Sequence, residues 1–255
     1  MRNEYGKLTA EQFKAFVAYL PGLRSTAKEM AELLRTASPQ ELGKLYKTAP
    51  VWADLYELPF LELVVSGVNG MGLGPRLKMA IDSPDAYGFL QADLDDDFRD
   101  VPEPNVSLDV TFRHLMPIWH SLQSVGYYGC SMPGLVALVR DHGEMDAVFK
   151  AVSIDPTVMN CPSIAAVIAK AQLARDSEFH ENLATAIKGP SKKIMPSLQD
   201  MRFSFFVLRE LGINDLSEED VRELMVGVLG VYADAPSSGK NLGEAYRKSK
   251  NQKTI

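Results

Sequence analysis

The chain has 255 residues, of which 46% are hydrophobic and 24% charged, and its net charge is −6. A chain of this length buries enough apolar surface to fold without disulfide bonds or metal ions. Its near-average composition excludes an intrinsically disordered protein, a collagen-like repeat and a small disulfide-rich scaffold.

Helix signals begin close to the N-terminus. Thr9 is suited to cap a helix because Gln12 occupies the matching capping-box position, and apolar residues follow at helical spacing until Pro21. A second helix is expected over residues 25–35. Ser38 begins a third, because a proline and then an acidic residue follow it in the first turn.

An apolar segment and a glycine-rich segment come next. Residues 60–66 fit either a buried strand or the end of a helix that begins near Val51. The glycines of residues 66–76 match neither the dinucleotide-binding nor the P-loop spacing. We therefore expect this stretch to be a connector or a tight turn between two helices.

Residues 82–105 form an acidic connector with a proline near each end, and prolines interrupt regular helix. Its densest part resembles the start of a calcium-binding loop but lacks the glycine and the glutamate that such a loop needs. We expect no metal there. Four carboxylates are instead candidate contacts for a protein partner: Asp93, Asp95, Asp96 and Asp97.

The fold class is predicted to be all-α, an irregular multi-helix bundle or a helical array. A minor β element near residues 106–112 is the alternative, because apolar residues alternate there from Val106 to Phe112. A helix that starts after Ser107 explains the same residues equally well.

Helices are also expected over residues 162–174, 177–188 and 197–211, and another should begin at Ser217, which precedes an acidic first turn. Gly143 is expected to end an earlier helix.

Cys161 is the candidate nucleophile. It precedes Pro162 at the start of an expected helix, where backbone N–H groups lower the pKa of a thiol. Burial in the core is the alternative, since no histidine neighbours it in sequence. With only Cys130 as its companion, it is expected to be a reduced thiol. The four histidines form no ligand motif, so we expect no metal and no cofactor.

Residues 233–255 are expected to form a flexible basic tail, and a final helix packed through Leu242 and Tyr246 is the alternative. The near-P-loop at Asp234–Asn241 lacks the residues that hold phosphate and magnesium. Four of its cations are candidate partner contacts: Lys240, Arg247, Lys248 and Lys250.

A second group of basic residues is expected to be solvated surface, with phosphate binding as the alternative. Its members are Lys188, Lys192, Lys193, Arg202 and Arg209.

The predicted organisation is a helical segment at 1–81, the connector at 82–105, a helical core at 106–232 and the tail at 233–255. The alternative is that residues 1–232 form one domain. The chain has no apolar run of membrane-spanning length and no apolar leader, so we expect a cytoplasmic protein with no membrane contact.

Because the sequence contains no complete catalytic motif, we expect a non-enzymatic protein that binds a protein partner. Two alternatives remain. One is a nucleic-acid-binding protein that uses the basic tail, and the other is an enzyme with dispersed active-site residues that include Cys161.

Overall fold

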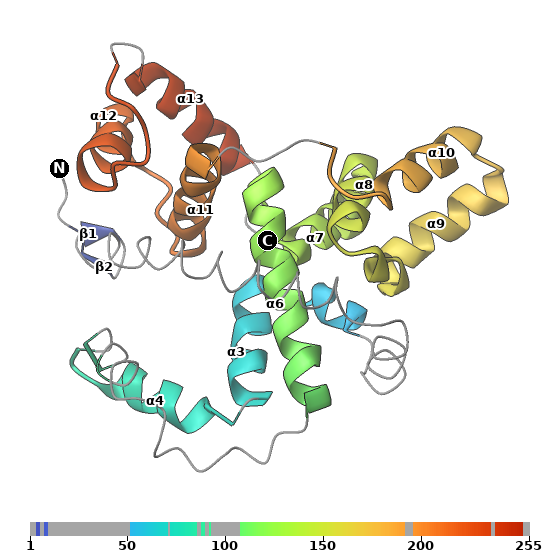
Figure 1. The fold of residues 1–255 in the computed structure, drawn as a ribbon, viewed down its shortest axis with the longest axis horizontal. Coiled ribbons are helices and arrows are strands. Elements are labelled where there is room, and N and C mark those ends of the chain that lie inside the picture. Colours follow the sequence, from blue (N-terminus) through green and yellow to red (C-terminus); the bar gives the residue numbers. More distant parts are fainter. Residues whose placement is uncertain are drawn as a thin grey trace.

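The computed structural model describes residues 4–5, 8–9, 52–70, 72–85, 88–89, 92, 108–191, 196–235 and 238–251. In these ranges ten α-helices pack against each other, so the fold is all-α as predicted (Figure 1). Two antiparallel strands of two residues each, β1 (Glu4–Tyr5) and β2 (Leu8–Thr9), form the sheet that is described. None of the described helices is long and apolar enough to cross a membrane.

The first described helices are separated by a proline. The 3₁₀ turn η1 (Ala53–Glu57) is followed by α3 (Phe60–Gly70). Leu58 is extended, as is usual for a residue before proline, so helix cannot continue through Pro59. Residues 60–66 are therefore helical, which excludes the strand, but their helix begins at Phe60 and not near Val51.

The glycine-rich stretch forms the end of α3, a tight turn and the start of α4 (Gly74–Asp82). Gly72 in the turn has a φ of 75°, which favours glycine. A Cβ atom on Gly67 would lie 2.9 Å from Cδ1 of Ile118, and one on Gly70 would lie 2.8 Å from the ring of His114. The expected helix–helix turn is confirmed, and the glycines also allow α3 to approach α6 closely.

The alternative of a strand near residues 106–112 is wrong, because residues 108–112 belong to helix α6 (Leu108–Tyr128). The alternation covered only seven residues, whereas apolar side chains at Met116, Trp119 and Val125 continue at helical spacing and are buried.

In the middle section, the boundaries that were predicted, at Gly143 and for the helices over residues 162–174 and 177–188, lie close to the observed ones, whereas the elements over residues 145–154 and 156–160 were not predicted. Gly143 ends the first helix of this section in the left-handed conformation, with a φ of 67°. The predicted helix over residues 177–188 ends two residues early. The elements are α7 (Met132–His142), α8 (Met145–Ile154), the 3₁₀ turn η3 (Pro156–Asn160), α9 (Pro162–Ala174) and α10 (Ser177–Ala186).

The C-terminal helices pack around a second cluster of buried side chains. Ser217 caps its helix, and Asp220 completes a capping box with it. These elements are α11 (Pro196–Glu210), α12 (Glu218–Arg222), the π-helical segment η4 (Glu223–Val228) and α13 (Ser238–Asn251).

Helix α13 shows that the expectation of a flexible tail is wrong for residues 238–251. Leu242 is completely buried and Tyr246 is 4% exposed. Both belong to the second cluster, and the Tyr246 hydroxyl donates a hydrogen bond to the carbonyl of Ile213. Two apolar side chains one turn apart were enough to dock this otherwise polar helix.

Helix α6 joins the two buried clusters. Trp119 belongs to the first cluster, with η1, α7, α8, α9 and α10, whereas Val125 belongs to the second, with α11, α12 and α13. Figure 1 shows α6 at the centre, with these two groups of helices on opposite sides.

Several predictions lie outside the described residues. They are the helices expected over residues 10–20 and 25–35, the helix start at Ser38, and most of the acidic connector, including Asp93 and Asp95–Asp97.

Candidate functional site

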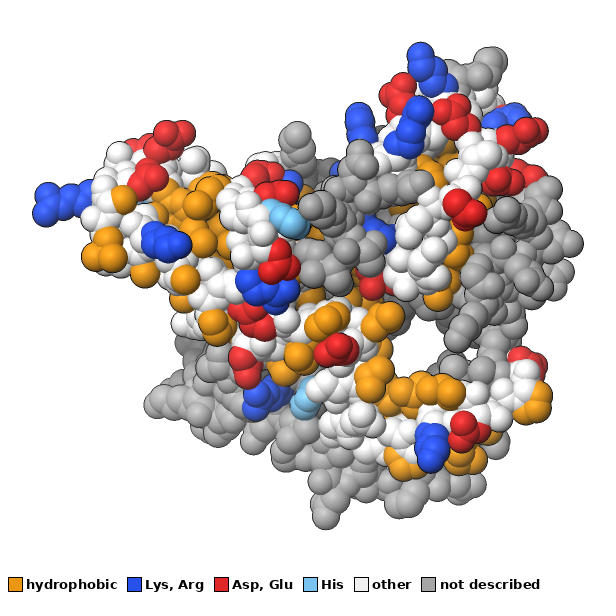
Figure 2. Space-filling view, turned by 180° about the vertical axis from the view of Figure 1, so that it is seen from behind, with side chains coloured by type: hydrophobic (Ala, Val, Ile, Leu, Met, Phe, Trp, Pro, Cys, Tyr) orange, Lys and Arg blue, Asp and Glu red, His pale blue; other side chains and the backbone are white. Residues whose placement is uncertain are grey.

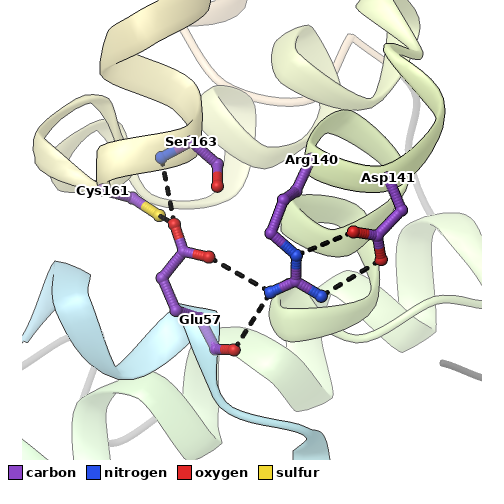
Figure 3. Close-up of polar contacts among 5 residues, drawn as sticks. All are labelled: Glu57, Arg140, Asp141, Cys161 and Ser163. Carbon is purple, nitrogen blue, oxygen red and sulfur yellow. Dashed lines mark hydrogen bonds and ion pairs between the residues drawn. The ribbon is translucent and has the colours of Figure 1, made fainter.

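Cys161 lies at the N-cap of α9, as predicted, but its side chain is completely buried. Its thiol donates a hydrogen bond to Oε1 of Glu57 across 3.1 Å (Figure 3). The same oxygen accepts a hydrogen bond of 3.0 Å from the backbone N–H of Ser163, in the first turn of α9. The Glu57 carboxylate therefore occupies the place where the helix N-terminus would hold an anion.

Arg140 holds Glu57 from the other side. Its Nη1 lies 3.2 Å from Oε2 of Glu57 and 3.3 Å from the Glu57 carbonyl oxygen. The guanidinium also forms two hydrogen bonds to Asp141. Burial by itself would raise the pKa of Glu57, but the hydrogen bonds from Cys161, Ser163 and Arg140 outweigh it and lower that pKa. Glu57 is thus an ionised carboxylate at neutral pH.

These surroundings make Cys161 a poor nucleophile. Burial raises the pKa of its thiol to about 12, and the hydrogen bond to Glu57 and its negative charge act in the same direction. The backbone N–H groups of Ser163 and Ile164, in the first turn of α9, act to lower this pKa, but burial and Glu57 outweigh them. The position at the N-cap was predicted correctly, but the anionic thiol that it suggested is not supported.

We expect neither cysteine to react with a thiol reagent at pH 7.5 in the folded protein. Cys130 is also buried, and burial raises its pKa to about 11. Absorbance after addition of dithionitrobenzoate should show two thiols in urea and almost none without it. Rapid labelling of Cys161 in the native state would contradict the burial described above.

A second carboxylate, Asp155, lies in a buried network. Its Oδ2 accepts hydrogen bonds from Nε1 of Trp52 at 2.9 Å and from the hydroxyl of Tyr56 at 2.7 Å. Thr157 donates to both carboxylate oxygens, and Nδ1 of His120 lies 3.2 Å from Oδ2. Burial would raise the pKa of Asp155, but its hydrogen bonds and the charge of His120 hold that pKa well below its usual value.

The network also requires a hydrogen on Nδ1 of His120. Tyr56 has one hydroxyl hydrogen and donates it to Asp155. Its oxygen therefore accepts from Nδ1 of His120, which lies 2.8 Å away.

Neither carboxylate was recognised from the sequence. Asp155 precedes Pro156 and caps η3, a local pattern that could have identified it. Its partners Trp52 and Tyr56 lie about 100 residues earlier in the sequence, and Glu57 is equally far from Cys161. No local sequence pattern could therefore have predicted these contacts. Through these hydrogen bonds, the two carboxylates hold η1 against the start of η3 and the start of α9.

Among the described residues, no group of three or more histidine, cysteine, aspartate or glutamate side chains is arranged to hold a metal ion.

The basic residues predicted as partner contacts are placed in part. Lys240, Arg247 and Lys248 are exposed on α13. Arg247 pairs with Glu218 of α12 across 3.0 Å, so its charge is already balanced. The side chain of Lys250 lies outside the description.

Two arginines expected on a solvated basic surface have structural partners instead. Arg202 donates to the carbonyl oxygens of Gly126 and Tyr127, and Arg209, only 6% exposed, donates to that of Gly129. These carbonyls lie at the C-terminal end of α6, which has a partial negative charge. The two arginines therefore cap α6.

Helix α9 has an unusual solvent-facing side. Ile164 and Ala171 are buried, and α9 packs on α7 and η3. On the opposite side, four apolar residues form an exposed stripe, Pro162, Ala166, Ala169 and Leu173, and the exposed side chains of Lys170 and Gln172 lie on either side of it. The Leu173 side chain is 87% exposed. Figure 2 shows hydrophobic side chains at the surface of the arm that α9 and α10 form, at its left.

No family model, no curated protein and no solved structure matches this chain.

Proposed function

We propose that this chain is a helical interaction protein that binds an amphipathic helix of a protein partner along the exposed face of α9. The single observation that supports this is the apolar character of α9 on its solvent side. An apolar stripe on the exposed side of a helix is normally covered, because exposed apolar surface is unfavourable in water. A partner that covers this face removes the conflict.

The spacing of the four exposed residues suits a second helix. Pro162, Ala166, Ala169 and Leu173 follow one another at intervals of four, three and four, which is the spacing of a coiled-coil seam. Small alanine side chains let two helix axes approach closely. Leu173 then supplies the large apolar anchor on which binding energy usually depends.

The charged residues beside the exposed face of α9 indicate the charge of the partner. Lys170 is the one charged residue of α9, and Arg175 follows directly after its C-terminal end. Both are exposed. Charges beside a helical seam select a partner of opposite sign. We expect the apolar face of the partner helix to be flanked by glutamate or aspartate.

The other two functions expected from the sequence have less support. An enzyme that uses Cys161 requires a thiolate, and that thiol is protonated at neutral pH. Nucleic-acid binding through residues 233–255 requires a strip of unbalanced cations. Arg247 is paired with Glu218, and Glu244 is exposed on the same helix as Lys240 and Lys248.

A photo-crosslinking amino acid tests the proposed surface in the cells that produce the protein. With p-benzoylphenylalanine at Ala169, one partner should be captured through a segment that is apolar on one face and acidic beside it. The matched control has the crosslinker at Glu178, an exposed residue of α10, and should not capture that protein.

Leu173→Glu is expected to reduce the captured partner at least tenfold, because it places a charge in the apolar contact. Because the Leu173 side chain is 87% exposed, this substitution should not change the fold. Equal capture from Ala169 and Glu178, or capture that Leu173→Glu does not reduce, would contradict the proposal. A crosslink to another copy of this chain would show that the protein covering this face is a second copy and not a different protein.

A further inference from the structure

A cleft of about 500 Å³ lies between the C-terminal end of α6 and helices α8, α10 and α11. This volume is in the range of small-molecule sites. Three partly exposed aromatic side chains line it, Tyr127, Tyr128 and Phe149. The cleft therefore offers apolar ring surfaces to a ligand.

Arg202 places a positive charge at the same cleft. Its guanidinium is partly buried and donates to the carbonyl oxygens of Gly126 and Tyr127. In the part of the chain that the structure describes, no carboxylate forms an ion pair with it. Burial lowers the pKa of Arg202, the direction expected for a cation that has lost water without gaining a counter-ion.

The contacts with α6 compensate this charge only in part. The C-terminal end of a helix has a partial charge of about −0.5, against the full positive charge of the arginine. Lys150 also lines the cleft, but it pairs with Asp146, another lining residue, so this pair adds no net charge and the charge of Arg202 remains. The cleft therefore favours an anionic group beside Arg202.

We propose that this cleft binds a small molecule that combines a planar ring with a carboxylate or phosphate group. The anionic group pairs with Arg202, and the ring lies against Tyr127, Tyr128 and Phe149. Guanidinium binds both kinds of anion through paired hydrogen bonds, and aromatic rings stack on one another. This site is separate from the exposed face of α9 and does not depend on the function proposed for that face.

Isothermal titration calorimetry of the full chain with four probes tests the proposal. Phenyl phosphate and benzoate have both features, whereas inorganic phosphate has the anion alone and benzyl alcohol the ring alone. We expect phenyl phosphate, benzoate or both to bind at least tenfold more tightly than the other two. The tighter of the two identifies the anion. No binding by either, or equal binding by inorganic phosphate, would overturn the proposal.

Two variants locate the binding. Arg202→Met should weaken it at least tenfold, and Lys188→Met, an exposed lysine outside the cleft, should leave it unchanged. Because Arg202 also caps α6, Thr185→Trp provides a second variant that fills the cleft and keeps the arginine. It should block binding while circular dichroism shows a native helix content. Binding that persists in folded Thr185→Trp protein would place the ligand elsewhere and refute the site.

Discussion

Replacement of Asp155 by alanine is expected to lower the free energy of unfolding by about 3–5 kcal/mol. Asp155 is 3% exposed and accepts hydrogen bonds from Trp52, Tyr56 and Thr157. Without the carboxylate, the Trp52 N–H and the Tyr56 hydroxyl lose their shared acceptor inside the protein. Urea unfolding followed by circular dichroism measures the change.

Two further variants show whether the loss of stability comes from the Asp155 hydrogen bonds or from the removal of any aspartate. Asp146→Ala removes an exposed carboxylate and should change the unfolding free energy by less than about 0.5 kcal/mol. Asp155→Asn keeps the shape of the side chain and removes its charge. A loss in Asp155→Ala no larger than that in Asp146→Ala would show that the network contributes little to stability.

The pH dependence follows from the depressed pKa of Asp155. Its ionised form stabilises the fold at every pH above the ordinary aspartate pKa of about 3.9. That contribution is lost as the pH falls from about 4 toward the lower pKa of the folded state. The difference in stability between the wild-type chain and Asp155→Asn should therefore shrink below about pH 4.

Leu242→Ala in α13 is expected to cost about 2–5 kcal/mol of stability, because it opens a cavity at a completely buried position. Glu244→Ala, two residues further along the same helix, changes an exposed side chain and should have almost no effect. Thermal unfolding of both variants measures the difference. Equal melting temperatures would mean that α13 does not contribute to the core.

The same comparison can be extended by ending the chain after Tyr232. This truncation removes both Leu242 and Tyr246 from the second buried cluster, and we expect a larger loss of stability than in Leu242→Ala. A truncated chain with an unchanged melting temperature would restore the interpretation of residues 233–255 as a flexible tail.

Local signals predicted several boundaries of the described helices correctly. Ser217 with Asp220, Gly143 after His142, and Cys161 before Pro162 each begin or end a helix in the structure. In each case, the side chain or the backbone conformation acts on groups within about four residues.

Packing decided the features that involve distant residues. The sequence of α13 is polar enough to suggest a tail, and only the cluster formed by Phe205, Leu208 and Leu224 shows what Leu242 and Tyr246 cover. Likewise, Cys161 has the local surroundings of a reactive thiol, but burial, together with Glu57, 104 residues earlier, raises the pKa of that thiol.

The sequence by itself determined that this chain is all-α, because helix periodicity and caps depend on neighbouring residues. Only the tertiary structure decided which charges are paired and which apolar side chains remain exposed. It placed Asp155 inside and Glu57 against the first turn of α9, paired Arg202 and Arg209 with the end of α6, and left the face around Leu173 in solvent. The physical reason is that burial and ion pairing depend on contacts between distant segments, which local sequence patterns do not encode.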